Sequence, residues 1–129
     1  MAGNQSHLPR VLIIDDNADL ARSLGCLLEH YGCQVETARD GVDGVRKAIA
    51  SSPDVVIVDL VLPGMTGYEV ARLLREKLPY HVILIAQTAY GSSDDRETAL
   101  ACGFDEHLVK PAEPSRLIRE VVSARRVGD

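Results

Sequence analysis

The stretch Val55-Val56-Ile57-Val58-Asp59 places a run of β-branched apolar residues directly before a carboxylate. An uninterrupted apolar run of this length is typical of a strand that is buried on both faces, as central strands of parallel sheets are. Residues 11–14 and 82–85 form two further runs of the same character. We therefore predict three central strands of a parallel sheet, one of which ends in Asp59.

Working outward, the mixed runs at 34–38 and 106–109 predict two strands nearer the sheet edges. Helical patterns separate the strands at about 18–31, 41–51, 67–78 and 93–102, and a last one begins near 114. The pattern at 93–102 is polar and predicts a mobile element. The side chains predicted to face the core are Leu20, Leu24, Leu27, Leu28 and Tyr31 in the first helix, Val42, Val45, Ala48 and Ile49 in the second, Val70, Leu73, Leu74 and Leu78 in the third, and Leu117, Ile118, Val121 and Val122 in the last.

Five strands that are each followed by a helix predict right-handed crossovers and an α/β fold with a doubly wound parallel sheet in the order 2-1-3-4-5. A chain of 129 residues, 46% apolar and 26% charged, is the size and composition of one globular domain. We expect a polar tail at 1–9, the domain at 10–126 and a short tail at 127–129. In such sheets the ligand binds beyond the carboxyl ends of the strands.

The overall charge and the terminal sequences limit the classes of function. A formal net charge of -5 and a pI near 5.3 make direct DNA binding improbable and favour a cation as ligand. No secretory signal or bilayer-length apolar segment is evident in the sequence, so we expect a soluble cytoplasmic protein without a membrane partner. The three cysteines lack metal-site spacing and are predicted to be buried free thiols.

Polar residues stand where four of the predicted strands end. Asp15 and Asp16 follow the first strand, Asp59 ends the third, Thr88 the fourth and Lys110 the fifth. Three crowded carboxylates repel one another, and a cation is needed to keep them ionised. Magnesium suits an all-oxygen shell that retains several waters, and Lys110 adds positive charge.

The position of Asp59 after a rigid apolar strand makes it the candidate nucleophile, because a carboxylate can accept a phosphoryl group as an acyl phosphate. Magnesium, Lys110 and the Thr88 hydroxyl would then stabilise the transferring oxygens. Taken singly, each residue has a plainer explanation as a helix cap, a turn residue or a surface charge. Their joint occurrence at strand ends is what favours a site.

Four stretches of the chain, taken together, resemble a known family. They are Val-Leu-Ile-Ile-Asp-Asp-Asn at 11–17, Pro-Asp-Val-Val-Ile-Val-Asp-Leu-Val-Leu-Pro-Gly-Met-Thr-Gly-Tyr-Glu-Val at 53–70, Thr-Ala-Tyr-Gly at 88–91 and Leu-Val-Lys-Pro at 108–111. From residue 10 to about 125, the chain resembles the receiver domain of two-component response regulators. The resemblance implies a flavodoxin-like (βα)5 fold.

The resemblance also implies a role for each residue at the strand ends. Asp59 would accept a phosphoryl group from a histidine kinase or a histidine phosphotransfer protein. Asp16 would bind Mg2+ most directly, with Asp15 assisting and the main-chain carbonyl of Val61 as a further ligand; Mn2+ would be a substitute. Lys110 would contact the phosphoryl group. The chain would catalyse its own phosphorylation and dephosphorylation and no other reaction.

Switching is expected to involve Thr88, which in this family turns towards the phosphoryl group. Its usual aromatic partner, Tyr or Phe, is replaced by His107, so we hypothesise a weakly pH-sensitive switch. The alternative is a partly exposed histidine without a switching role. Val61 and Tyr90 flank the site at positions that influence hydrolysis in the family, and they predict a comparatively long-lived phosphoryl state.

The predicted output surface is the face of the fourth helix, fifth strand and fifth helix, around Ala99, His107 and Arg119. A downstream protein would bind there, and a phosphorylation-dependent homodimer is left open. The tract at 103–111 resembles receivers of hybrid histidine kinases, so the chain is either a stand-alone regulator or a hybrid-kinase segment. Remoter alternatives are a Mg-dependent phosphohydrolase, a flavin-binding electron carrier and an unphosphorylated scaffold.

Overall fold

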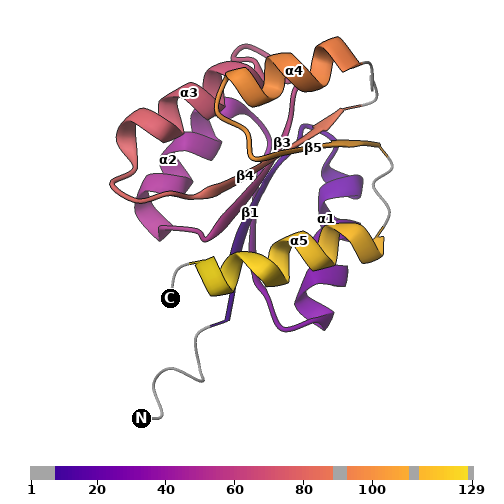
Figure 1. Cartoon of the computed structure of the whole chain (residues 1–129). Helices are drawn as coiled ribbons and strands as arrows, with labels where there is room; N and C mark the ends of the chain where they lie inside the picture. Colours follow the sequence, from indigo (N-terminus) through magenta and orange to yellow (C-terminus); the bar gives the residue numbers. More distant parts are fainter. Residues whose placement is uncertain (1–7, 89–92, 111–113, 128–129) are drawn as a thin grey trace.

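Strands and helices alternate strictly along the chain (Figure 1). The computed structural model describes residues 8–88, 93–110 and 114–127. The elements are β1 (Arg10–Ile14), α1 (Ala18–His30), β2 (Gln34–Ala38), α2 (Gly41–Ser51), β3 (Val55–Asp59), α3 (Gly67–Lys77), β4 (Ile83–Thr88), α4 (Ser93–Ala101), β5 (Glu106–Val109) and α5 (Pro114–Val127). The predicted alternation of strand and helix is confirmed.

The strands are parallel and form one sheet in the order β2-β1-β3-β4-β5. This confirms the predicted order, with β2 and β5 at the edges. Val11 of β1 lies between Val35 of β2 and Val55 of β3, and Val55 lies beside Ile83 of β4. Because all strands point the same way, the residues that follow them collect at one edge of the sheet.

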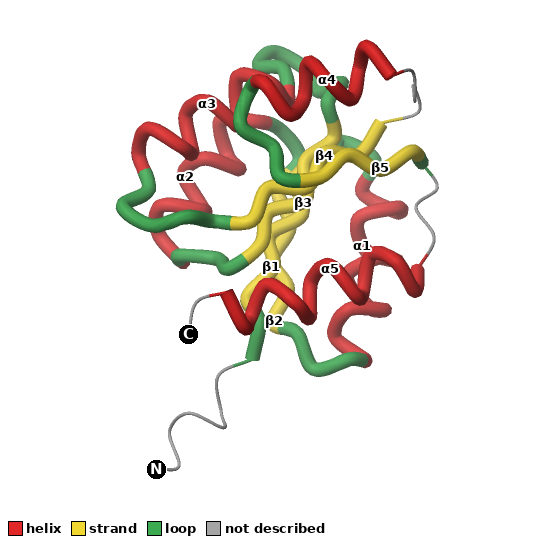
Figure 2. The backbone as a smooth tube through the Cα atoms, in the orientation of Figure 1, coloured by secondary structure: helices red, strands yellow, loops and turns green. Residues whose placement is uncertain are grey.

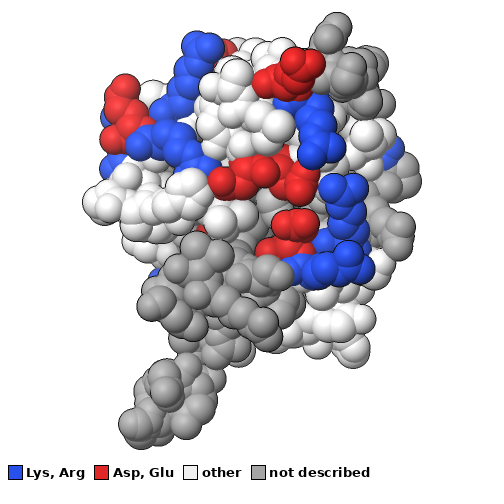
Figure 3. Space-filling model, in the orientation of Figure 1, with Lys and Arg blue, Asp and Glu red and all other residues white. Residues whose placement is uncertain are grey.

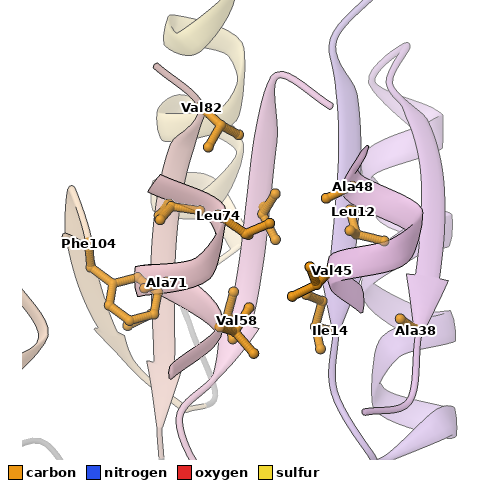
Figure 4. Close-up of a cluster of buried hydrophobic side chains, with 14 of the residues drawn as sticks. Leu12, Ile14, Ala38, Val45, Ala48, Val58, Ala71, Leu74, Val82 and Phe104 are labelled. Carbon is orange, nitrogen blue, oxygen red and sulfur yellow. The ribbon is translucent and has the colours of Figure 1, made fainter. Parts of the chain in front are cut away.

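Helices cover both faces of the sheet, with α1 and α5 on one face and α2, α3 and α4 on the other (Figure 2). The face under α2 and α3 has a buried apolar cluster, part of which Figure 4 shows, that includes Leu12, Val45, Val58, Leu74 and Val82. The face under α1 and α5 has a second cluster, which includes Val11, Leu28, Ile57, Ile85 and Leu117. Burial on both faces explains why the central strands read as continuous apolar runs.

The inward face of α2 differs from the predicted one. Two of its four predicted core side chains are buried, but Val42 is 66% exposed and Ile49 is 51% exposed. A Cβ atom added to Gly44 would lie 2.4 Å from the Cδ1 atom of Ile14. The helix therefore approaches β1 through a glycine. The prediction for Val42 and Ile49 was wrong because apolar periodicity does not register a glycine as a packing residue.

The same correction applies to α1. Leu28 is fully buried as predicted, but Leu20 and Tyr31 are exposed. Here too a glycine faces the sheet, since a Cβ added to Gly25 would lie 3.2 Å from the Cγ1 atom of Val35. The small residue turns the contact face of α1 away from the side of the helix that carries Leu20 and Tyr31.

The remaining predicted core residues are placed as follows. Leu24 and Leu27 of α1 are half-buried. Val70, Leu74 and Leu78 are buried and Leu73 is half-buried, while Leu117 and Val121 of α5 are buried and Ile118 is half-buried. The side chain of Val122 lies outside the described residues. The prediction that the three cysteines are buried was wrong for two of them. Cys33 is buried, and burial raises the pKa of its thiol, whereas Cys26 is exposed and Cys102 half-buried.

Candidate functional site

The carboxylates of Asp15 and Asp59 both contact the ammonium group of Lys110. Lys110 Nζ donates hydrogen bonds to Asp15 Oδ2 at 2.9 Å and to Asp59 Oδ2 at 2.8 Å. The side chains of Asp15, Asp59 and Lys110 are 3%, 10% and 17% exposed. The ends of β1, β3 and β5 are thus joined at one edge of the sheet, where the sequence predicted them to meet.

These contacts determine the charge of Lys110. Burial by itself would lower the pKa of the amine, but the hydrogen bonds to Asp59 and Asp15 and the charges of both carboxylates outweigh that effect. The pKa of Lys110 therefore lies above its ordinary value. The lysine is a cation at neutral pH, and it offsets part of the repulsion between the two carboxylates.

The second oxygen of each buried carboxylate accepts a hydrogen bond from the main chain. Asn17 N donates to Asp15 Oδ1 at 2.9 Å, and Val61 N donates to Asp59 Oδ1 at 3.0 Å. Asn17 also caps α1, because its side chain accepts a hydrogen bond from Leu20 N. Both carboxylates are therefore held at both oxygens, one by a lysine and the other by the turn that follows the strand.

Asp16 adds a third carboxylate to this edge. One oxygen from each of Asp15, Asp16 and Asp59 lies within 4.8 Å of the others. Asp16 is exposed whereas the other two are buried. An all-oxygen set of this kind suits a hard divalent cation such as Mg2+. Each oxygen of Asp15 and Asp59 has a lone pair beyond the single hydrogen bond that it accepts, so these carboxylates, together with that of Asp16, fit the metal.

The loop between β3 and α3, residues 60–66, is called the acceptor loop below. It ends in a capping box, in which Glu69 N donates to Thr66 Oγ1 and Thr66 N donates to Glu69 Oε1. Gly67 N donates to Leu60 O at 3.1 Å and closes the loop. The Thr-x-x-Glu pattern before a helix is a sequence signal that could have located this cap.

Thr88, the predicted switch residue, is the last residue of β4 and is 2% exposed. Its carbonyl accepts a hydrogen bond from Lys110 N at 2.7 Å. The preceding residue, Gln87, lies beside Asp59 in the register of the sheet. The main chain of β4 therefore touches both the lysine and the strand end that carries Asp59.

His107 lies in β5 beside Ala86 and is 6% exposed. Its Nε2 atom is buried and has no hydrogen-bond partner among the residues that the structure describes. Ala99 of α4 is fully buried, whereas Arg119 of α5 is exposed. The prediction that Ala99 and His107 form part of an exposed output surface was wrong, because α4 packs over this part of the sheet. The alternative of a partly exposed His107 is also contradicted.

Charged side chains mark the outer surface around β5. Glu106 Oε1 lies 3.9 Å from the guanidinium of Arg96 in α4 and 3.6 Å from that of Arg116 in α5. Basic and acidic side chains alternate on the face seen in Figure 3. This face therefore has no field of a single sign, and its ion pairs connect the two helices through the edge strand.

Arg75 of α3 holds the connection between α4 and β5. The sequence did not predict this role for Arg75. Its guanidinium donates to Val82 O at 2.6 Å, to Gly103 O at 2.7 and 2.9 Å, and to Asp105 Oδ2 at 2.8 Å. Asp105 Oδ2 also accepts a hydrogen bond from Leu84 N. No local pattern predicts this network, because two of its partners lie 28 and 30 residues from Arg75.

Four residues of the quoted motifs, Ala89, Tyr90, Gly91 and Pro111, lie outside the described residues. Val61, the other predicted neighbour of the phosphoryl group, is 61% exposed. Within residues 8–88, 93–110 and 114–127, none of the helices combines the length and apolar character that crossing a bilayer requires.

Fold and site together define a class of α/β domains that bind a cation or a phosphoryl group at the carboxyl edge of a parallel sheet. The family model described as the response regulator receiver domain matches residues 11–122, and the chain belongs to this family. Receiver domains are the signalling switches of two-component systems, accept a phosphoryl group, and bind Mg2+ at an acidic pocket.

Individual relatives agree with this assignment. Response regulator ArlR of Staphylococcus aureus is 34% identical over 114 residues, which are 88% of this chain and 51% of that protein. The chain thus spans about half the length of the curated relatives it matches. A Francisella response regulator receiver domain superimposes with a TM-score of 0.87 at 25% identity, covering 94% of this chain and 99% of that one. A receiver domain protein from Clostridium thermocellum gives a TM-score of 0.85 at 30% identity, covering 94% and 97%.

Proposed function

We propose that this chain is a phosphorylation-gated signalling switch in which Asp59 accepts a phosphoryl group from a histidine kinase or a histidine phosphotransfer protein. The observation that supports this most strongly is the hydrogen bond from Lys110 Nζ to Asp59 Oδ2 at the edge that also holds Asp15. A carboxylate fixed at the end of a buried strand and placed beside a cation is suited to become an acyl phosphate.

During transfer, an oxygen of Asp59 forms the new O–P bond. The N–P bond of the donor phosphohistidine breaks, and its electron pair returns to the imidazole nitrogen. Lys110 stands beside the acceptor carboxylate and stabilises negative charge on the phosphoryl oxygens. The hydrogen bond from Val61 N to Asp59 Oδ1 restricts rotation of the carboxylate, which lowers the entropic cost of attack.

Asp15, Asp16, Asp59 and the main-chain carbonyl of Val61 would hold Mg2+, with Mn2+ as a substitute. Bound there, the metal supplies positive charge to the phosphoryl oxygens. The exposed Asp16 is the ligand we assign to the most direct contact. Asp15 assists from its buried position, where Lys110 already restrains it.

Thr88 would turn its hydroxyl towards the new phosphoryl group and thereby shift α4; residues 89–92, between β4 and α4, lie outside the described residues. Because the described part of α4 has one buried side chain, Ala99, a small displacement can shift this helix against β5. His107, buried on the same side of the sheet, would be the second switch residue. The weak pH sensitivity expected for His107 stays a prediction.

The surface of α4, β5 and α5 would then bind a downstream protein, or a second copy of the chain in a phosphorylation-dependent homodimer. We place the domain at 10–126 and expect neither direct DNA binding nor a membrane partner. The domain serves either a stand-alone regulator or, as the tract at 103–111 favours, a hybrid sensor histidine kinase.

The exposed, apolar Val61 offers no hydrogen bond to an attacking water, so the phosphoryl group should persist for minutes rather than seconds.

Intact-protein mass after incubation with Mg2+ and acetyl phosphate tests the acceptor. We expect the mass of one phosphoryl group to be added to the wild type only when Mg2+ is present, and to be absent from Asp59→Asn. The matched control is Asp54→Asn, which changes an aspartate just before the opposite end of β3 and should be modified normally. Modification of Asp59→Asn to the wild-type extent would contradict the proposal.

A further inference from the structure

Gly67, the first residue of α3, lies against the main chain of the acceptor aspartate. A Cβ atom added to Gly67 would lie 2.5 Å from Asp59 O, 2.7 Å from Leu60 Cα and 3.1 Å from Asp59 C. All three are main-chain atoms, so no rotamer change could relieve the contact. Gly67 is not among the glycines with positive φ. What this position requires is therefore space, and not a backbone conformation that only glycine adopts.

The main chain that Gly67 touches is the part that orients the acceptor carboxylate. Asp59 Oδ1 is held by Val61 N, two residues along the chain. Leu60 stands between these two residues, and its carbonyl oxygen accepts a hydrogen bond from Gly67 N. The capping box at the start of α3 fixes the position of Gly67 itself. A side chain at position 67 would press on the main chain between the Asp59 carboxylate and the Val61 amide that holds it.

We propose that Gly67 is a positioning residue for phosphoryl acceptance. By allowing α3 to touch the main chain at residues 59 and 60, it keeps the Asp59 carboxylate within reach of Lys110 and of the Val61 amide. This proposal rests on the proposed function of Asp59 and adds to it a residue that touches neither donor nor metal.

Two other glycines provide graded comparisons. A Cβ added to Gly41 would lie 2.9 Å from Val70 Cγ2 in α3 and 3.0 Å from Met65 Cβ in the acceptor loop, so it would press on both segments through side chains. A Cβ added to Gly44 would meet the side chain of Ile14 at 2.4 Å, and its three nearest atoms all belong to that core side chain and none to the acceptor loop. The expected order of effect on phosphorylation is Gly67→Ala, then Gly41→Ala, then Gly44→Ala.

The experiment compares the three alanine variants with the wild type in four measurements. These are urea unfolding, the metal-free amide resonance of Val61, the affinity for Mg2+ alone, and the rate of phosphorylation as a function of acetyl phosphate concentration. For Gly67→Ala we expect a shifted Val61 resonance, weaker Mg2+ binding and a maximal rate lowered by about tenfold or more, with little change in half-saturating donor. For Gly44→Ala we expect lower stability, an unchanged Val61 resonance and a near-normal rate.

Each outcome bears on the proposal. Wild-type rates and Val61 resonance in a folded Gly67→Ala variant would overturn it, and so would rate losses that follow loss of stability equally in Gly67→Ala and Gly44→Ala. If Gly67→Ala does not fold, Gly41→Ala is the test variant. An unchanged Val61 resonance and an unchanged phosphorylation rate in Gly41→Ala would then overturn the proposal. Phosphorylation that persists in Asp59→Asn would instead show that the proposed function is wrong.

Discussion

At the ends of β1 and β3, each buried carboxylate accepts one hydrogen bond from Lys110 and one from the main chain. On the α4 side of β5, by contrast, no atom of the described part of the chain forms a hydrogen bond with the buried Nε2 atom of His107. The helix above it is polar, and Ala99 is its buried residue among those whose side chains are described. The first region is built to hold charged groups in fixed positions. The second is anchored at the α4–β5 connection by Arg75 and by the ion pairs of Glu106, but only one of the described side chains of α4 is buried against the sheet.

This difference suggests that the first region serves the chemistry of phosphoryl acceptance and the second serves the response to it. A firmly held acceptor speeds chemistry because little reorganisation is needed. A weakly packed helix shifts in response to a small local force, because few contacts oppose its movement. Thr88 is placed between the two regions, since its carbonyl bonds to Lys110 N and its strand leads to α4.

Replacing Lys110 by Met should have the largest effect, because it removes the cation from between two buried carboxylates. We expect the free energy of unfolding without metal to fall by about 3 kcal/mol, and phosphorylation to be strongly reduced. Lys47→Met is the control, since Lys47 makes half-buried contacts with Thr37 O and Asp43 and should cost less than about 1 kcal/mol. Equal losses in urea unfolding would show that the acidic region is no more tightly held than the surface.

Arg75→Met should come next, by releasing the anchor of the α4–β5 connection. Loss of its hydrogen bonds to Val82, Gly103 and Asp105 should lower the free energy of unfolding by about 2 kcal/mol. Phosphorylation of Asp59 should stay near normal. Arg72→Met on the same helix is the control, because Arg72 is exposed and should have a near-neutral effect. A phosphorylation defect in Arg75→Met that is absent from Arg72→Met would contradict the view that the two regions are independent.

His107→Phe should change stability in the opposite direction. A phenyl ring of similar shape removes the unpartnered Nε2 atom, so we expect a gain of about 1 kcal/mol in urea unfolding. His81→Phe is the contrasting variant, because His81 Nε2 lies 3.0 Å from Asp105 Oδ1 and its removal should destabilise. A destabilised His107→Phe would mean that the imidazole is better accommodated beneath α4 than its missing hydrogen bond implies.

The smallest effect is expected at Asp43 on α2, which lies outside both regions. Desolvation, the largest single influence, raises the pKa of its carboxyl, but the hydrogen bonds and charges of Arg46 and Lys47 together outweigh it and lower the pKa below its ordinary value. A lowered pKa stabilises the fold above the unfolded value of 3.8, and this contribution is lost as pH falls through the folded pKa.

Asp43→Asn should therefore be slightly less stable than the wild type at neutral pH, and the difference should vanish in strong acid. Urea unfolding of both proteins, from neutral pH down to strong acid, measures this difference in the free energy of unfolding. Asp19→Asn is the control, since Asp19 and Arg22 are highly exposed and 4.0 Å apart. A difference between Asp43→Asn and the wild type that is independent of pH would point to a cause other than charge.

The sequence predicted the sheet order and the meeting of Asp15, Asp59 and Lys110, because buried strands and strand ends are visible in a local pattern. It did not predict the contact faces of α1 and α2, where Gly25 and Gly44 replace apolar side chains. Hydropathy cannot identify such contacts, since a glycine allows a helix to approach the sheet closely because it has no side chain.

The sequence also failed to show how the regions are held. The hydrogen bonds of Arg75 depend on three segments that only the folded chain brings together. The burial of His107 depends on how α4 packs, and the polar sequence of that helix gave no sign that it covers β5.

Backbone amide hydrogen exchange with and without phosphorylation tests the central claim most directly, namely that a phosphoryl group on a firmly held acceptor is transmitted to a loosely held face. In Mg2+ with acetyl phosphate, we expect exchange to change in α4 and β5, at 93–101 and 106–109, and to stay the same in α2. Asp59→Asn under the same conditions should show no change. A phosphorylated protein whose exchange changes only around Asp59, or equally in α2 and α4, would contradict the account.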